Sequence, residues 1–299
     1  MTDMTFTEGG SFEGGRVKTS RGRRGAAAGG GVGLLAIAVY VISQLTGVNL
    51  TPVVDAVQGG APGAVQATES TLGTCSAAEA NSQRDCRLSA TVYALDTYWA
   101  ETLPANNLTF SQPDVWSFES AMETGCGTAS ASTGPFYCPP DKAIYIDLGF
   151  YDLLQSQYGA SGGALAEMYV VAHEYGHHIQ QITGVMDQAN RQGTGADSDS
   201  VKTELQADCY AGLWTGHAAT VVDPKTGVTF LNPITQTELS DALSAAQAVG
   251  DDHIQQQSSG GVNPDTWTHG SSEERQRWFM TGYTEGTITA CDTFSAASL

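Results

Sequence analysis

Residues 164–182 read ALAEMYVVAHEYGHHIQQI and contain the pattern H-E-x-x-H at His173, Glu174 and His177. On a helix, residues four apart lie one above the other on the same face, so both imidazoles can reach one metal ion. Glu174 lies one position further round the helix, where its carboxylate can take a proton from the attacking water and return it to the leaving amine. The alternative is a histidine-rich helix packed in a core, because chance produces the pattern in about one chain in a hundred.

A second segment, ELQAD at residues 204–208, supplies the other groups that a catalytic zinc site needs. Such a site has three protein ligands and one open position. Glu204 and Asp208 are four residues apart and share one face of the next predicted helix. We expect Glu204 to be the third ligand of one Zn²⁺ per chain, and Asp208 to accept the N–H of a ligating imidazole. A solvated acidic face is the alternative, but the apolar run YAGLW that follows indicates a buried helix, where unpaired carboxylates are costly.

The other histidines give weaker signals. His269 lies in a polar turn before a predicted helix and could donate a hydrogen bond to the oxyanion of a tetrahedral intermediate, although a loop histidine can also be merely exposed. His178 points about 100° away from His177 on the helix, which predicts a place behind the motif or on the surface. His217 and His253 have no partner at ligand spacing, so we interpret them as structural.

The hydrophobic pattern predicts one α+β domain that is mainly helical with a small sheet. Strands are expected over residues 115–119 and 143–148. Helices are expected over residues 88–100, 161–182, 200–217, 236–256 and 272–283. Ser271 and Glu274 have capping-box spacing at the start of the last helix. The polar segment 186–200, MDQANRQGTGADSDS, is expected to be a mobile loop that shapes the cleft.

The chain of 299 residues has 13 basic and 32 acidic side chains, which gives a net charge of −19. The charge is uneven, because residues 1–50 carry five bases and three acids while the remainder carries 8 bases and 29 acids. A domain this acidic repels phosphate backbones, so the composition argues against a nucleic-acid partner.

No charged residue occurs between Gly25 and Val54, and a basic cluster precedes this run. Residues 29–50 would span about 33 Å as a helix, close to the thickness of a bilayer core of about 30 Å. The positive-inside rule then predicts a single-pass membrane protein with residues 1–28 as a basic cytoplasmic tail, 29–50 as the transmembrane helix, 51–73 as a flexible linker and 74–299 as an extracytoplasmic domain. A cleaved signal peptide is the alternative, although no small-x-small site follows the apolar core.

All six cysteines lie beyond the apolar segment, and an even number outside the cytoplasm suggests disulfides. Six cysteines allow 15 connectivities. Local spacing favours Cys75–Cys86 and Cys126–Cys138, which leaves Cys209–Cys291 to tie the C-terminal tail to the middle of the domain. A cysteine-based zinc site is the alternative, but no C-x-x-C pair is present.

Several stretches together resemble the bacterial neutral zinc metallopeptidases of the YpfJ type. They include a basic, glycine-rich N-terminus before one hydrophobic span, and the following segments: GPFYCPPDKAIYIDLGFYDLL (134–154), VVAHEYGHHIQ (170–180), ELQADCYAG (204–212), HGSSEERQRWF (269–279) and ACDTF (290–294). The resemblance implies a zincin-like fold with a gluzincin-type site, in which His173, His177 and Glu204 bind zinc and Glu174 is the base. It also strengthens the expectation for His269, because the HG[ST] element recurs in the family.

These observations favour a membrane-anchored zinc metallopeptidase that acts on a peptide or protein substrate. A catalytically silent, membrane-anchored binding or regulatory module is the alternative, which the loss of Glu174 or of one ligand would have indicated. Hydrolysis of a non-peptide amide is a third hypothesis, because the same activated water attacks any carbonyl within reach.

Overall fold

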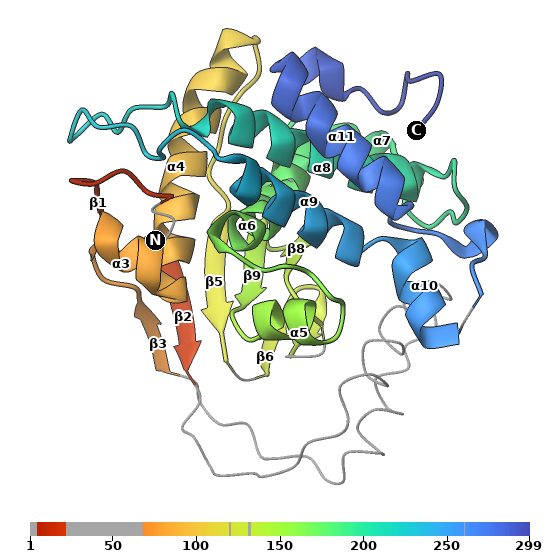
Figure 1. Cartoon of the computed structure of the whole chain (residues 1–299), viewed down its shortest axis with the longest axis horizontal. Coiled ribbons are helices and arrows are strands. Elements are labelled where there is room, and N and C mark those ends of the chain that lie inside the picture. The colour runs from red at the N-terminus through yellow and green to blue at the C-terminus, as the bar shows by residue number, and fades with distance from the viewer. Residues whose placement is uncertain (1–4, 22–67, 120, 131–132, 260) are drawn as a thin grey trace, which may run out of the picture.

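A computed structural model describes residues 5–21, 68–119, 121–130, 133–259 and 261–299, and it confirms a mixed α+β fold (Figure 1). The two predicted strands are present as β5 (Asp114–Phe118) and β9 (Ala143–Asp147). Four predicted helices are present as α4 (Arg84–Ala105), α6 (Ala164–Ile182), α8 (Asp199–Ala218) and α11 (Ser272–Glu285). Ser271 and Glu274 form the predicted capping box at the start of α11.

The main sheet has five strands in the order β3-β2-β5-β9-β8. Its other members are β2 (Val17–Arg21), β3 (Thr68–Thr71) and β8 (Phe136–Cys138). Strands β2, β5 and β9 run parallel, whereas β3 and β8 are antiparallel to their neighbours at the two edges. Two further ribbons pair β1 (Ser11–Phe12) with β4 (Cys75–Ser76), and β6 (Met122–Thr124) with β7 (Gly127–Ala129).

Residues 5–21 belong to the same folded unit as the rest of the described chain. The side chains of Phe6, Phe12 and Val17 are only 0–1% exposed and pack in the main hydrophobic core. This differs from the predicted division, in which the domain begins at residue 74. The sequence offered no signal for it, because β2 is short and polar and gains its place only by pairing with β5 and β3.

The predicted transmembrane helix, residues 29–50, and most of the predicted linker lie outside the described residues. Within the described ranges, no helix is long and apolar enough to cross a bilayer. Arg21 pairs with Thr68, so the chain leaves and re-enters the sheet at one edge. Strands that pair in one sheet lie on the same side of a membrane, so a single crossing by residues 29–50 cannot separate β2 from β3 and β5. The predicted combination of a cytoplasmic tail over residues 1–28 with an extracytoplasmic domain is therefore wrong, because residues 5–21 fold as part of that domain.

The helices form a layer in which α6 lies between the sheet and α8, and α11 packs along α8 (Figure 1). The approach of α6 to α8 is close at Gly176, where a Cβ atom would lie 3.0 Å from the carbonyl oxygen of Ala207. The remaining helices are α3 (Ala77–Ser82), α5 (Phe150–Ser156), α7 (Val185–Gln188), α9 (Gln236–Ala248), α10 (Asp251–Ser259) and two short 3-10 turns, Pro264–Thr266 and Ile288–Cys291.

The single helix predicted over residues 236–256 is wrong, because the chain divides there into α9 and α10. The break lies at Gly250, where a Cβ atom would lie 2.5 Å from the Ser272 hydroxyl at the start of α11. The local pattern is helical throughout, so only packing against α11 reveals the break.

The three disulfides have the favoured connectivity: Cys75–Cys86, Cys126–Cys138 and Cys209–Cys291. The first ties β4 to α4, the second holds the end of edge strand β8, and the third fastens the C-terminal tail to α8.

Candidate metal centre

Helices α6 and α8 bring three predicted ligands together. Donor atoms of His173, His177 and Glu204 all lie within 4.8 Å of one another. The Nε2 atom of His173 is 3.2 Å from one Glu204 oxygen, and the Nε2 atom of His177 is 3.4 Å from the other. Ligands bound at 2.0–2.1 Å to a tetrahedral zinc ion lie about 3.3 Å apart. Both nitrogen–oxygen distances are close to this value, so the three side chains fit a zinc ion.

His173 is oriented by a buried network behind the ligands. Its Nδ1 lies 2.8 Å from Asp208, as predicted, and this leaves Nε2 for a metal. Asp208 also accepts hydrogen bonds from the Tyr169 hydroxyl at 2.5 Å and from the Arg275 guanidinium at 2.8 and 3.0 Å. Burial opposes ionisation of Asp208, but the charges of Arg275 and His173 hold its pKa below the usual range. The carboxylate stays charged and can polarise the ligating imidazole.

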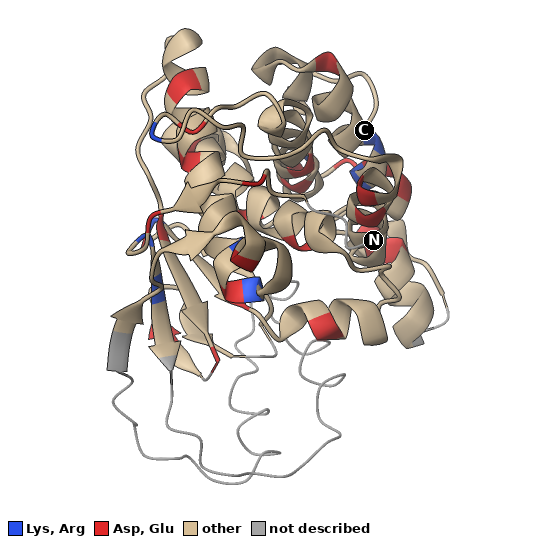
Figure 2. Ribbon diagram, turned by 60° about the vertical axis from the view of Figure 1, so that its left-hand side comes forward, with Lys and Arg blue, Asp and Glu red and all other residues tan. Residues whose placement is uncertain are grey.

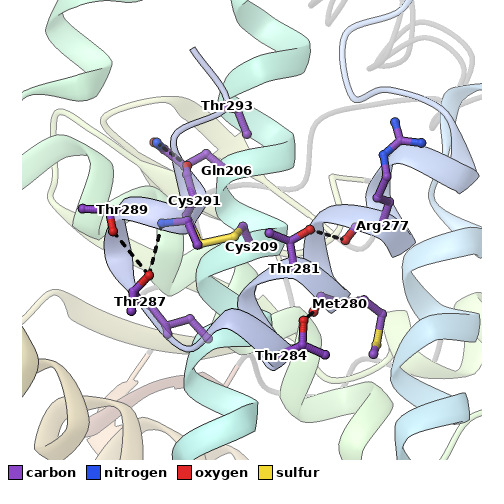
Figure 3. The surroundings of a disulfide bond; sticks show 12 residues. Gln206, Cys209, Arg277, Met280, Thr281, Thr284, Thr287, Thr289, Cys291 and Thr293 are labelled. Carbon is purple, nitrogen blue, oxygen red and sulfur yellow. Dashed lines mark hydrogen bonds between the residues drawn. A yellow bond between two sulfur atoms is a disulfide. The ribbon is translucent and has the colours of Figure 1, made fainter. Parts of the chain in front are cut away.

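His177 is oriented by a second chain of contacts that ends at a disulfide. Its Nδ1 lies 2.9 Å from the side-chain oxygen of Gln180. Gln180 in turn donates to Gln206 at 3.1 Å, and Gln206 donates to the backbone carbonyl of Cys291 at 2.9 Å. Figure 3 shows this last contact beside the Cys209–Cys291 bridge. The bridge thus fixes the segment on which the orientation of a ligand depends.

Glu174 faces the cavity but is not among the clustered ligand atoms. Burial raises its pKa above the ordinary value, while the neighbouring His173 and His177 oppose this rise. The backbone of Tyr137 in β8 hydrogen-bonds to its carboxylate. Glu174 therefore lies between the ligand group and the edge strand of the sheet, where a base can reach a substrate.

His269 lines the same cavity and is held by Asp251. One oxygen of Asp251 accepts the backbone N–H groups of Thr268, His269 and Gly270 at 2.7–3.1 Å. The other oxygen lies 3.3 Å from His269 Nδ1, so Nε2 is the nitrogen available to a ligand in the cavity. Burial disfavours the charged imidazole, but the Asp251 carboxylate outweighs this and raises the pKa of His269.

These groups surround a cavity of about 390 Å³. Its walls come from β8, α5, α6, the segment after α7, α8, the α9–α10 junction and the loop before α11. Aromatic and aliphatic side chains form most of the wall away from the ligands, which is typical of a substrate site.

A family model described as "Putative neutral zinc metallopeptidase" matches residues 3–294. The chain belongs to this family. The chain is 50% identical over 222 residues to the uncharacterized proteins Rv2575 of Mycobacterium tuberculosis and Mb2605 of Mycobacterium bovis, covering 74% of each chain compared. It is 36% identical over 268 residues to the uncharacterized protein YpfJ of Escherichia coli K12, covering 88% of this chain and 86% of YpfJ. No solved structure shows significant similarity to it. Family membership and the His173, His177 and Glu204 cluster together assign zinc as the cofactor.

The structure also places the remaining predicted residues. His178 is fully buried, with Nε2 2.6 Å from the Ser111 carbonyl and Nδ1 3.1 Å from the Tyr137 hydroxyl, and it does not line the cavity. His217 and His253 make hydrogen bonds to backbone carbonyls, in keeping with structural roles. Part of the segment 186–200 lines the cavity, as expected, but the segment is not a loop throughout, because α7 extends to Gln188 and α8 begins at Asp199.

Sequence analysis missed Arg275, Gln180 and Asp251. Two of them carried a local signal. Arg275 lies on the buried face of α11 together with Trp278 and Gly282, and a charge on such a face predicts a buried ion pair. Gln180 lies one turn after His177, which is contact spacing on a helix. Asp251 carried no signal, since it is 18 residues from His269 in the chain.

Proposed function

We propose that this chain is a zinc-dependent peptidase with a gluzincin-type site. The observation that carries the proposal is the convergence of His173, His177 and Glu204 on one side of a cavity that Glu174 also enters. The arrangement of two ligands on one helix and a glutamate on the next supports the zincin-like interpretation of the fold.

Each residue has a role that follows from its position. A bound zinc ion supplies Lewis acidity and makes water a stronger nucleophile at neutral pH. Glu174 takes a proton from the attacking water and later returns it to the leaving amine. His269, held by Asp251, donates a hydrogen bond to the oxyanion of the tetrahedral intermediate. Asp208 and Gln180 keep the two imidazoles in the tautomer and orientation that binding requires.

The substrate binds as an extended peptide beside β8. This strand pairs with β9 on one side and is the last strand in the sheet order, so its other edge can accept a further strand. Phe136 and Tyr137 of β8 line the cavity, and the hydrogen bond of Tyr137 to Glu174 couples this strand to the base.

The domain acts outside the cytoplasm. All six cysteines are paired, and three disulfides persist in oxidising compartments but are rare in the cytosol. Membrane attachment through residues 29–50 remains a prediction from the sequence, but not as a single crossing. In that case, the pairing of Arg21 with Thr68 requires the segment to leave and return on the side where the domain folds.

The decisive experiment compares two isosteric variants of the purified full chain. Glu174→Gln keeps the size of the side chain but cannot accept a proton, so zinc content should stay at one per chain. Its hydrolysis of an unfolded protein should fall by about two to four orders of magnitude. Glu204→Gln should instead lose zinc, because a neutral amide is a poorer ligand than a carboxylate. Metal content is measured by mass spectrometry, and a chelator should abolish wild-type activity.

Two results would contradict the proposal. Equal cleavage by the wild type and Glu174→Gln would mean that the activity belongs to another site or to a contaminant. A wild-type protein that holds zinc but cleaves no member of a broad peptide library would favour a silent binding module.

A further inference from the structure

The cavity differs in chemistry from one end to the other. Val170, His173, Glu174 and His177 line it from α6, and they lie on one face of that helix. From Val170 to His177 the helix rises about 10 Å. These four residues define two ends of the cavity along α6, a Val170 end and a His177 end. The predicted ligands on α6 lie in the middle and at the His177 end.

The Val170 end is apolar. Tyr158, from the turn after α5, and Ile254 of α10 line the cavity with Val170 of α6. The backbone carbonyl of Tyr158 lies 2.9 Å from His253 in α10, which brings Ile254 to the same place. Phe150 and Val249 add half-buried apolar surface to the cavity wall. This end can take a large apolar side chain.

The His177 end carries a free positive charge. Arg191 lines the cavity there and its side chain is exposed, next to Met186, Ser200 and Thr203 in the cavity wall. Thr203 lies beside the C-terminal part of α6, because its carbonyl accepts a hydrogen bond from the Gln180 side chain at 2.7 Å. Within the described ranges, no carboxylate lies within 4.0 Å of the Arg191 guanidinium to form an ion pair.

The backbone segment around Arg191 is held in place by three hydrogen bonds. The backbone N–H of Asn190 donates to Asp199 at 3.0 Å, and the Ser200 hydroxyl donates to the carbonyl of Gly193 at 2.6 Å. A third bond joins the N–H of Gly195 to the carbonyl of Trp267, beside the loop of His269. The backbone segment that carries Arg191 is thus joined to both α8 and the His269 loop.

The charge of Arg191 is unusual in this molecule. Acidic residues outnumber basic ones by 32 to 13, and Figure 2 shows them spread over the whole ribbon. The other arginine in the cavity wall, Arg275, is neutralised by Asp208 and is buried. An unpaired guanidinium at the edge of a cavity in an acidic protein favours a carboxylate as its ligand.

We propose that Arg191 is a specificity-determining residue that binds a carboxylate of the substrate. The preferred substrate is a peptide with a large apolar residue at one end of the cavity and this carboxylate at the other. An extended peptide advances about 3.3 Å per residue, so the two groups are about three residues apart. The carboxylate is either an acidic side chain or the C-terminus of the peptide. The inference rests on the proposed peptidase function.

The experiment uses fluorogenic peptides with one Phe and with Glu moved through the neighbouring positions, each matched by a Gln peptide. Every peptide is made with a free and with an amidated C-terminus, which separates the two sources of the carboxylate. For the wild type, we expect a carboxylate at one position to raise kcat/KM by about 3- to 10-fold, and added salt to reduce the preference. Arg191→Gln should abolish it, and Arg191→Glu should favour a Lys peptide. Gln192→Ala, an exposed neighbour outside the cavity wall, should keep the wild-type preference.

Binding separates failure of this inference from failure of the proposed function. The same peptides, labelled with a fluorophore, are titrated with the zinc-loaded Glu174→Gln variant, with and without Arg191→Gln. If the wild type cleaves the panel but its preference survives in Arg191→Gln, the inference is overturned and the peptidase proposal stands. If nothing is cleaved, the peptidase proposal fails. Equal affinity for the Glu and Gln peptides in the binding assay would then overturn the role of Arg191 as well.

Discussion

Arg16→Met tests whether the N-terminal segment supports the active-site helix. Arg16 precedes β2, and its guanidinium donates to both oxygens of Asp96 at 2.6 and 3.1 Å. Asp96 in α4 is 4% exposed and also accepts the hydroxyl of Tyr175, the residue after Glu174, at 2.7 Å. Methionine keeps the aliphatic part of the side chain but removes the charge, so Asp96 is left buried beside Tyr175 alone.

The expected cost follows from the burial of Asp96. Removing one partner of a buried ion pair costs about 3–5 kcal/mol. The loss of stability has an upper limit, because Asp96 can take up a proton instead of staying charged. Each unit by which the pH exceeds the unfolded pKa adds about 1.36 kcal/mol to this limit. Burial already raises the pKa of Asp96 above its ordinary 3.8, with Arg16 opposing, and the variant should raise it further. At pH 7 the limit above an unfolded pKa of 3.8 is about 4 kcal/mol, so we expect a loss of about 3–4 kcal/mol.

The pH dependence has a definite sign. A carboxyl group whose folded pKa is raised costs stability only above its unfolded pKa, and the cost grows as the pH rises towards the folded value. At pH 5 the limit falls below about 2 kcal/mol. The penalty of Arg16→Met should therefore shrink when the pH is lowered from 7 to 5.

Equilibrium unfolding in urea, followed by tryptophan fluorescence and circular dichroism with the disulfides intact, measures these losses. In thermal unfolding at pH 7 without urea, the same loss should lower the melting temperature by about 6–16 °C, given about 2–4 °C per kcal/mol for a domain of this size. Lys18→Met is the matched control on the same segment, because its ion pair with Asp114 is similarly short, at 2.8 Å, but the side chains are 37% and 54% exposed. We expect that variant to lose less than about 1 kcal/mol.

A double variant protects the test against an unspecific effect of the substitution. Adding Asp96→Asn to Arg16→Met removes the buried charge and should recover most of the lost stability. The reasoning would be refuted if Arg16→Met unfolded within 1 kcal/mol of the wild type, since residues 5–21 would then not be part of the folded domain.

Three further predictions concern the site and the disulfides. Asp251→Asn removes the charge that raises the pKa of His269, so the alkaline limb of the kcat/KM profile, which lies above pH 6.5 in the wild type, should move to lower pH. If the alkaline limb did not move, Asp251 would not control the pKa of His269. Gln180→Leu removes the acceptor for His177 and should weaken zinc binding by about 10–100-fold in competition with a chelator, while unchanged affinity would contradict the orienting role. Alkylation of the native, non-reduced protein should detect no free thiol, and three or more modified cysteines would argue against an oxidising compartment.

Features that depend on neighbours within one helix were accessible from the sequence. The spacing of His173 and His177, and of Glu204 and Asp208, determines which side chains share a helix face, whatever the helix packs against. The capping box at Ser271 is likewise local. The short spacing of Cys75 and Cys86 and of Cys126 and Cys138 favoured their pairing, and the third bridge followed from the two remaining cysteines.

Tertiary structure decided the features that join distant parts of the chain. Strand β2 has no apolar alternation and becomes a strand because β5 and β3 supply its hydrogen bonds. Gly250 ends a helix because α11 leaves no room for a side chain. Arg275 reaches Asp208 across 67 residues, and Asp251 holds a loop 17 to 19 residues away. The sequence alone therefore determined which residues could bind and activate a substrate, because helical periodicity fixes their faces. Packing decided the contacts of Arg275 and Asp251 that hold Asp208 and His269, because those contacts exist only once separate elements meet.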